Sequence, residues 1–426
     1  MIRVSGGHAR TALAALAHVP EPRRAELAAI ASRGTILDHG LVLWFPGPAS
    51  ATGEDIAEFH VHGGRAVVAA VLDALAALPG LRPAEPGEFA RRAFLAGKLD
   101  LAQAEALADL IAADTEAQRA QAQRQLQGGL SRRLDGWRDE ILRALAHVEA
   151  AIDFADDEVP GADVVADTVV RVNALLPELR ASLDRRGERL RDGVHAVILG
   201  APNVGKSSLL NRLAQRDAAI VSATAGTTRD VLEVHLDVGG YPVILADTAG
   251  LRATADEVES EGVRRALTRA AAADIKIAIF DAAAWPARDA ATAALVDATA
   301  LVVVNKSDIL PSAPPSGEAR GGGSSDSVYP ISARTGAGMD EFLAALGLAV
   351  AAVAGSEEPA LTRTRHAAAV RECIACLERF VRDSALSLEL RAEELRLAAR
   401  AIGRITGRVD VEDLLDVIFA EFCIGK

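Results

Sequence analysis

The chain has 426 residues, of which 50% are apolar and only 4% aromatic, and its formal net charge is −13. This length predicts about two to four domains, and the composition favours helices over β-sandwiches. The negative charge excludes a chain that attracts nucleic acid through its overall field, so any such contact needs local basic patches or a partner protein.

The chain contains three cysteines, no evident signal peptide and no apolar run of membrane-spanning length. These features predict a reduced, cytoplasmic setting without a membrane. Cys373 and Cys376 form a C-x-x-C spacing, but no second pair accompanies them. Because they lie in an alanine-rich helical stretch, core packing is favoured over a metal or redox site.

The chain divides where its composition changes. Residues 1–98 mix glycine and proline turns with strand and helix patterns, which predicts an α+β domain, and residues 99–192 are helical in periodicity. Residues 193–351 alternate strands with helices, which predicts a doubly wound parallel sheet. Helical periodicity returns over residues 352–426, so we expect an α/β module inserted into an α-helical domain built from both flanks.

A glycine-rich loop, Gly200 to Ser207, lies between an apolar run and a helical pattern. Strand, loop and helix in this order are typical of a phosphate-binding loop (P-loop), whose backbone N–H groups point at phosphate oxygens. Lys206 is then expected to reach the β- and γ-phosphates, and the hydroxyl of Ser207 to hold Mg2+. The loop residues expected to bind nucleotide are Asn203, Val204, Gly205, Lys206, Ser207 and Ser208.

Two further segments are expected to sense the γ-phosphate. A threonine hydroxyl after Gly226 can cap Mg2+ and later release it, which is an order–disorder switch. Thr228 is the better candidate and Thr227 the alternative. The second segment ends an apolar run, where a carboxylate can sit behind the Mg2+ water shell. It consists of Asp247, Thr248, Ala249 and Gly250.

A third motif predicts the base. Asn305, Lys306 and Asp308 end another apolar run, and a carboxylate placed like Asp308 can accept both N–H groups of a guanine edge. Adenine lacks that donor pair, so GTP is favoured over ATP. A segment after a further strand pattern is expected to complete the pocket; it consists of Ser332, Ala333 and Arg334. The module resembles the translation-factor class of GTPases.

Hydrolysis requires a positioned water and neutralised charge. Ras-like switches use a glutamine where this chain has Leu251, which can do neither job. The segment from Asp256 to Glu261 offers several carboxylates, and no arginine is an obvious arginine finger. A bound monovalent cation could replace the finger, with Asn203 supplying an uncharged oxygen.

Nearly the whole chain resembles the tRNA modification GTPase family MnmE, also called TrmE. The resemblance rests on the GTPase motifs together with segments from the N-terminal region, the helical regions and the C-terminus. These segments are Leu43–Pro48, Thr52–Asp55, His62–Gly64, Pro86–Phe89, Arg92–Gln103, Ala150–Phe154, Ala392–Leu397 and Phe422–Lys426.

The resemblance implies a homodimer that forms a heterotetramer with a partner protein using FAD and NADH. It implies addition of an aminomethyl or carboxymethylaminomethyl group to carbon 5 of the wobble uridine of tRNA. The one-carbon unit would come from a tetrahydrofolate, 5-formyl or 5,10-methylene, bound by residues 1–98, which would also dimerise. The competing function is a regulatory GTPase switch in ribosome assembly or other RNA processing, without substrate chemistry.

The resemblance also assigns residues. The family's folate-contacting residues fall on Arg3, Glu58, Lys98 and Lys426, and Cys423 would lie near the folate in a role left open. Folate carries a carboxylate tail that needs cations and a pterin edge that suits a carboxylate. Potassium would be coordinated by Asn203 and by a loop that supplies Ser222, Ala223, Thr224, Ala225, Gly226 and Thr227. The water-orienting glutamate falls on Glu259.

One departure from the family concerns the N-terminus. Family members usually begin with a longer segment that includes a first strand, whereas this chain starts at Met1, inside that element. Either the start codon was chosen too late or the domain is shorter, and a shorter domain is expected to have an unpaired sheet edge and a partly open folate pocket. Residues 312–325 are expected to form a surface insert without an assigned role, and the arginines of 185–191 are either a tRNA contact or a solvated helix face.

Overall fold

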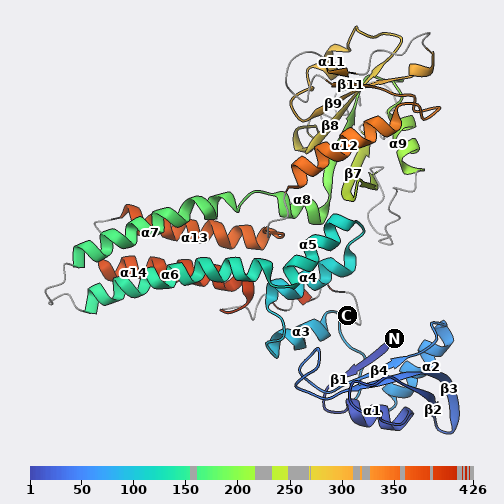
Figure 1. The fold of residues 1–426 in the computed structure, drawn as a ribbon, viewed down its shortest axis with the longest axis vertical. Coiled ribbons are helices and arrows are strands. Elements are labelled where there is room, and N and C mark those ends of the chain that lie inside the picture. The colour runs from blue at the N-terminus through green and yellow to red at the C-terminus, as the bar shows by residue number, and fades with distance from the viewer. Residues whose placement is uncertain are drawn as a thin grey trace, which may run out of the picture. The chain divides into compact units, whose positions relative to one another are not determined.

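The computed structural model describes residues 1–153, 161–215, 233–247, 268, 270–309, 317–318, 327–355, 360–383, 387–409, 415, 418–419 and 422 (Figure 1). Its internal contacts divide the chain into two units. The first unit comprises Met1–Ala108, Gln125–Asp156 and Leu386–Lys426, and the second comprises Asp109–Arg124 and Asp157–Ala385. Within the described ranges, no helix combines the length and the apolar character needed to cross a membrane.

The first unit begins with a four-stranded antiparallel sheet of spatial order β1-β4-β3-β2. Its elements are β1 (Ile2–Ser5), α1 (Ala9–Leu16), β2 (Glu26–Ser32), β3 (Thr35–Phe45), β4 (Ile56–His60) and α2 (Arg65–Ala76). Because side chains alternate along a strand, Ile2, Val42 and Phe59 share one face and pack with both helices. Arg3 points to the other face, directly opposite Glu58 on β4. The alternation thus sets two of the predicted folate residues side by side.

Helices complete the first unit. They are α3 (Glu88–Leu95), most of α4 (Leu101–Ala112), α6 (Gly129–Asp153) and α14 (Leu388–Thr406). Helices α6 and α14 lie side by side (Figure 1). The Arg396 guanidinium on α14 pairs with Glu149 on α6 at 2.7 Å. An apolar cluster that includes Leu101 and Phe419 joins α4 to the C-terminal part of the chain.

The second unit contains a seven-stranded sheet of order β10-β11-β9-β8-β5-β7-β6. Its strands are β5 (Val194–Leu199), β6 (Glu233–Val238), β7 (Tyr241–Asp247), β8 (Ile275–Asp281), β9 (Ala300–Asn305), β10 (Gly317–Glu318) and β11 (Ser327–Pro330). The five strands from β11 to β7 are parallel, whereas β6 and β10 are antiparallel edges. Strand β9 is buried along its whole length, as expected when both faces are covered. The predicted doubly wound α/β module is confirmed.

The helices of the second unit cover this sheet or extend from it. They are α5 (Glu116–Leu126, mostly in this unit), α7 (Gly161–Ala181), α8 (Arg186–Asp192), α9 (Lys206–Ala214), α11 (Ala290–Ala293), α12 (Met339–Ala354) and α13 (Thr364–Arg382), with a 3-10 turn, η1 (Ser307–Ile309). Leu209 of α9 and Phe342 of α12 join the core on one face of the sheet, and Val197 of β5 packs toward Ala270 on the other.

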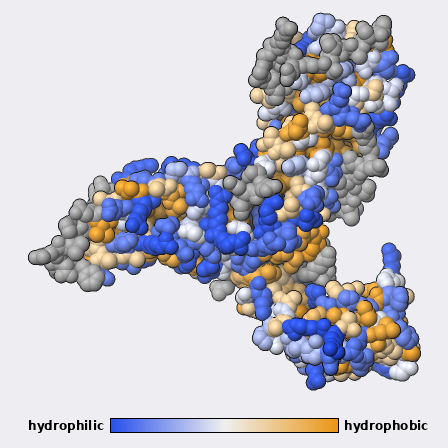
Figure 2. Space-filling model, viewed as in Figure 1, coloured by the Kyte–Doolittle hydropathy of each residue, from blue (hydrophilic) through white to orange (hydrophobic). Residues whose placement is uncertain are grey.

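Helices α7 and α13 pack together in the second unit, where Arg180 pairs with Glu378 at 2.7 Å. Their visible surface in Figure 2 mixes polar and apolar patches, and Val170 of α7 is one of the exposed apolar side chains. Cys373 and Cys376 lie on the buried side of α13 and are not joined by a disulfide, and Arg379 Nη2 donates to Cys376 Sγ at 3.1 Å. Burial raises the pKa of the Cys373 thiol well above its usual value. Both features favour core packing over a redox role for this C-x-x-C spacing.

Candidate functional site

Glycines shape the loop between β5 and α9. Gly205, directly before α9, has φ = 101°, and Asn203 has φ = 64°. A Cβ on Gly200 would lie 2.7 Å from the backbone oxygen of Ile279, and one on Gly205 would lie 2.2 Å from Nδ2 of Asn305. Glycine is therefore required at both positions. The loop is a tight turn at the N-terminus of α9, where backbone N–H groups and the helix dipole favour an anion.

Lys206 is the first residue of α9. Its Nζ donates hydrogen bonds to the carbonyl oxygens of Gly200 (2.8 Å) and Ala201 (2.9 Å), so its charge lies along the loop. Ser207 and Ser208 are exposed in the first turn of the helix, and Val204 is buried. These positions fit the predicted phosphate and Mg2+ ligands at the opening of a helix.

Asn305, at the end of β9, links two loops. Its side chain is buried, its Nδ2 donates to the carbonyl oxygen of Val204 at 2.8 Å, and its Oδ1 accepts the N–H of Ala333 at 2.9 Å. The sequence motif predicted a base-binding residue here. The structure adds that Asn305 fixes the phosphate loop to the segment 332–334.

Asp308 lies in η1 beside that segment. Ser332 Oγ donates to its Oδ1 at 2.7 Å, and Nε and Nη2 of Arg334 donate to its Oδ2 at 3.1 and 2.6 Å. The Ser332 hydrogen bond, followed by those from Arg334, lowers the pKa of Asp308. The carboxylate is thus ionised at neutral pH. The structure brings together three of the six residues that the sequence assigned to the base pocket, namely Asp308, Ser332 and Arg334.

Lys306 precedes Asp308 with φ = 67°, and its Nζ pairs with Asp281 at 2.7 Å. The hydrogen bond from Lys306 lowers the pKa of Asp281. This pair joins the end of β8 to the loop after β9, a contact that the sequence did not predict.

Asp247 is the last residue of β7 and lies opposite Ile198 on β5. Parallel neighbours end at the same sheet edge, so its backbone is next to the phosphate loop. Its side chain lies outside the described part of the chain, as do thirteen other predicted residues. These are Ser222, Ala223, Thr224, Ala225, Gly226, Thr227, Thr228, Thr248, Ala249, Gly250, Glu259, Cys423 and Lys426.

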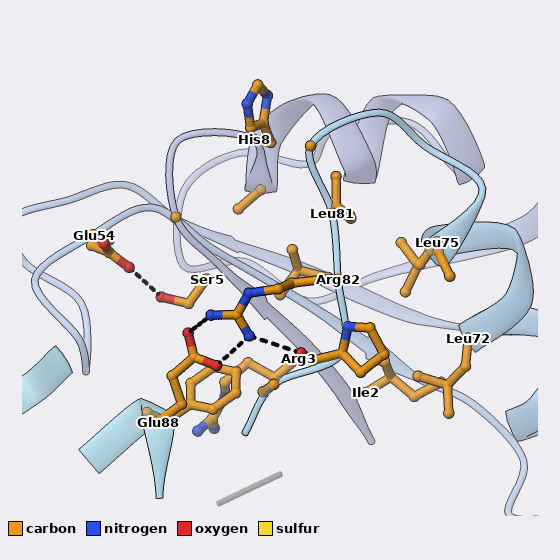
Figure 3. Close-up of a pocket in the computed structure, with 18 of the residues that line it drawn as sticks. Ile2, Arg3, Ser5, His8, Glu54, Leu72, Leu75, Leu81, Arg82 and Glu88 are labelled. Carbon is orange, nitrogen blue, oxygen red and sulfur yellow. Dashed lines mark hydrogen bonds and ion pairs between the residues drawn. The ribbon is translucent and has the colours of Figure 1, made fainter. Parts of the chain in front are cut away.

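A second candidate site is a cavity of about 470 Å³ in the first unit (Figure 3). It lies along β1 and is bounded by the start of α1, by α2, by the loop that contains Arg82 and by α3. Leu72 and Leu75 line one end, and Arg82 and Glu88 meet at the other, near Arg3 (Figure 3). This volume is typical of a small-molecule site that combines apolar walls with a few polar groups.

Alternating charges line the polar end of the cavity. Glu88 Oε1 accepts from Arg82 at 2.8 Å and also from Arg92, whose other Nη donates to Glu54 at 2.8 Å. Ser5 Oγ donates to Glu54 at 3.0 Å. Burial opposes ionisation of Glu88, but the hydrogen bonds led by that from Arg82 outweigh it and lower its pKa to about 2.

This network uses residues to which the sequence assigned no role. Glu54, Glu88 and Arg92 all lie in segments that carry the family resemblance. The available signal was the i, i+4 spacing of Glu88 and Arg92 on one helix, which predicts an ion pair. Their contact with Glu54 depends on the tertiary fold.

The predicted folate residues are placed differently from one another. Arg3 lines the cavity and pairs with Glu58 at 2.7 Å, and Glu58 also contacts His60 Nε2 at 3.0 Å. Burial raises the pKa of Glu58, but the hydrogen bonds from His60 and Arg3 lower it overall. Glu58 and Lys98 are not among the lining residues, and Lys98 is exposed after α3. Of the four predicted residues, the described structure brings together Arg3 and Glu58.

The arginine-rich stretch 185–191 is neutralised locally. Each of its four arginines has a carboxylate within ion-pair distance. The pairs are Arg185–Glu188, Arg186–Asp184, Arg189–Asp274 and Arg191–Asp192. The stretch therefore fits a solvated helix face whose charges are compensated by nearby carboxylates better than a positively charged patch that binds tRNA.

Known proteins match the chain over its full length. A family model described as "MnmE helical domain" matches residues 101–423, and one described as "GTP-binding protein TrmE N-terminus" matches residues 1–98. The tRNA modification GTPase MnmE of Paramagnetospirillum magneticum is 57% identical over 430 residues, which cover 100% of this chain and 96% of the relative. The Danio rerio protein "5-taurinomethyluridine-[tRNA] synthase subunit GTPB3, mitochondrial" is 48% identical over 452 residues, with 100% and 90% covered.

Solved structures match parts of the chain more distantly. A variant of the Aquifex aeolicus protein Era, bound to GDP.AlF4−, is 23% identical with a TM-score of 0.28, over 45% of this chain and 68% of that one. A similarity at this level does not bear on function.

The phosphate loop, the parallel sheet and the Asn305–Asp308 motif at a strand end define a P-loop GTPase. Family models match both the N-terminal and the helical part of the chain, and a relative that is 57% identical covers it completely. The chain belongs to the MnmE (TrmE) family of tRNA modification GTPases.

Proposed function

We propose that this protein is the GTP-hydrolysing component of a complex that adds an aminomethyl or carboxymethylaminomethyl group to carbon 5 of the tRNA wobble uridine. The observation that carries the proposal is that Asn305 links the phosphate loop at Val204 to the segment 332–334 at Ala333, in a chain that matches MnmE from end to end. The name of the Danio rerio relative specifies a carbon-5 substituent on a tRNA uridine.

Guanine recognition follows from the ionised Asp308. Its two oxygens suit the adjacent N–H donors of guanine, and the hydrogen bond from Ser332 holds Oδ1 in place. The guanidinium of Arg334 presents a similar donor pair to Oδ2, so it must release that oxygen when the base binds. A base without the donor pair would leave the carboxylate unsatisfied.

The residues at the start of α9 fit a Mg2+-bound triphosphate. Because Gly200 and Gly205 carry no side chain, phosphate oxygens could approach the backbone N–H groups of the loop closely. Ser207 and Thr228 would hold Mg2+, and Asn203 with Ser222, Thr224 and Thr227 would hold K+. Such cations oppose the negative charge that develops on the phosphates during hydrolysis. Glu259 would orient the attacking water.

The cavity beside β1 is proposed to bind the tetrahydrofolate. Its volume suits a ligand of that size, and Arg3 supplies a donor at its polar end. Its lining carries three arginines (Arg3, Arg82 and Arg92) and three carboxylates (Glu54, Asp73 and Glu88), so these charges balance. The cation for the folate tail would then come from Lys98 or Lys426. A second copy of the chain and a flavin- and NADH-using partner would complete the complex.

Calorimetry with 5-formyltetrahydrofolate tests the substrate role directly. We expect the wild type to bind, and Arg3→Gln and Lys98→Ala each to bind more weakly because a donor or cation is lost. Glu85→Gln, an exposed change outside the cavity lining, is the matched control and should bind like the wild type. Absence of binding to every variant and to the wild type would favour a GTPase switch without substrate chemistry.

A further inference from the structure

Helix α5 buries polar residues that the nucleotide and folate sites do not use. Its sequence, EAQRAQAQRQL, has one large apolar residue, yet Gln121 and Gln125 are 8% and 3% exposed, and Thr115 directly before the helix is 4% exposed. Buried polar side chains are costly unless they are hydrogen-bonded. The hydrogen-bond partners of these side chains therefore indicate which neighbouring segments α5 positions.

The N-terminus of α5 is capped by the GTPase sheet. The N–H of Ala117, which has no partner within the helix, donates to the carbonyl oxygen of Gly240 in the β6–β7 turn at 2.9 Å. Gln118 Oε1 accepts the N–H of Thr115 at 3.1 Å, and its Nε2 donates to the carbonyl oxygen of Arg191 at 2.8 Å. One glutamine thus joins the start of α5 to the end of α8.

Gln121 makes the second link to α8, because its Nε2 donates to the carbonyl oxygen of Gly187 at 3.1 Å. Helix α8 leads through Gly193 into β5, which ends at the phosphate loop. The β6–β7 turn leads along β7 to Asp247. Helix α5 therefore holds the starts of the two strands whose far ends form the nucleotide site.

The other end of α5 belongs to the first unit. The helix runs without a break to Leu126, whose carbonyl oxygen accepts from Gln103 Nε2 at 2.9 Å. Gln103 is itself fixed by two hydrogen bonds with Asp100, at 2.8 and 2.9 Å. The first nine residues of this continuous helix thus belong to the second unit and its last two to the first.

We propose that Gln118 and Gln121 are positioning residues that couple the nucleotide state of the GTPase module to the first unit through α5. The inference rests on the proposed function, since it needs a GTP-driven change at the ends of β5 and β7. A shift of β7 or α8 breaks or reforms hydrogen bonds to the Gly240, Arg191 and Gly187 carbonyls and so displaces the helix. A purely structural cap would stabilise α5 equally in every nucleotide state.

Hydrogen exchange of the full chain in GDP and in a non-hydrolysable GTP analogue tests the coupling. In the wild type, we expect amide exchange to differ between the two nucleotides both over residues 233–247 and over residues 116–126. Gln118→Glu keeps the acceptor for the Thr115 N–H but loses the donor to Arg191, and Gln121→Met loses the donor to Gly187. In both variants the nucleotide-dependent difference over 116–126 should fall about five-fold or more, while that over 233–247 persists.

Gln123, on the same helix, supplies matched controls, and Gln123→Glu and Gln123→Met should behave like the wild type. Identical exchange over 116–126 in the two nucleotide states would overturn the coupling, as would full retention of the difference in both variants. If Gln121→Met lowers the melting temperature, the partly exposed Gln118→Glu carries the test alone. Loss of any nucleotide effect over 233–247 in the wild type would instead contradict the proposed GTP switch.

Discussion

Asp308 is the residue on which the choice of base is proposed to depend. Its side chain is held from two sides, by Ser332 and Arg334, with both oxygens near the end of β9. Hydrogen bonds to a charged group are stronger than those between neutral groups, and a polar group that loses its partner on binding weakens the complex. One carboxylate can therefore separate guanine from adenine.

Replacing Asp308 with Asn should exchange one base preference for another. The amide offers a donor where the carboxylate accepted, so we expect GDP affinity to fall about 100-fold. Affinity for xanthosine diphosphate, which has a carbonyl where guanine has its amino group, should rise. Equilibrium titrations of both nucleotides measure the switch, and unchanged GDP affinity would remove Asp308 from the base site.

Asn305 should matter for stability as well as for binding. Asn305→Ala leaves the Ala333 N–H and the Val204 carbonyl without their partner, which costs about 1–3 kcal/mol of unfolding free energy. Asn305→Asp keeps the acceptor for Ala333 but places a buried carboxylate oxygen against the Val204 carbonyl, so it should lose at least as much. Urea unfolding of the two variants gives the comparison; equal stability of Asn305→Ala and wild type would show that the link between loops contributes nothing.

At the level of secondary-structure elements, α3 is tied to the rest of the N-terminal cavity by Glu88. Its carboxylate accepts from Arg82 on the preceding loop and from Arg92 one turn later on the helix. These contacts fix the loop, the helix and, through Arg92 and Glu54, the region after β3. The cavity is thus held open by ion pairs at its polar end.

The contribution of Glu88 should depend on pH in a definite direction. Its pKa is about 2 in the folded protein against an ordinary 4.5. Because the folded pKa is depressed, the stabilisation is present above pH 4.5 and is lost as the pH falls toward 2. We expect Glu88→Gln to lower the thermal midpoint above about pH 5 and to converge on the wild type near pH 2. A difference that stays constant over this range would show that the ion pairs are not its cause.

Local sequence patterns predicted the strands and helices correctly, but they did not predict the contacts between residues far apart in the chain. The apolar runs before Gly200, Asp247 and Asn305 correctly predicted strands of a parallel sheet, because strand ends and glycine turns are encoded within a few residues. The Asn305 link to Val204 and the Glu54–Arg92 pair join residues far apart in the chain. Such pairs depend on how strands and helices pack, which periodicity does not encode. Residues 109–124 belong to the same unit as the GTPase module, and this grouping also depends on long-range packing.

For the whole molecule, GTP turnover should depend on the monovalent cation. With no arginine finger predicted and Leu251 in place of the usual glutamine, K+ at Asn203 is the proposed source of positive charge. A finger in that role accelerates hydrolysis about 10³-fold or more, so turnover in KCl should exceed that in NaCl by at least about ten-fold. Asn203→Ala should reduce this ratio while retaining nucleotide binding. Equal rates in the two salts would remove Asn203 from its proposed role.

The most direct measurement is mass spectrometry of tRNA nucleosides from a strain that lacks this protein. We expect the wobble uridine to lose its carbon-5 substituent in this strain, and the wild-type chain but not Asp308→Asn to restore it. An unchanged nucleoside profile in the deletion strain, or full restoration by Asp308→Asn, would contradict a GTP-dependent role in this modification.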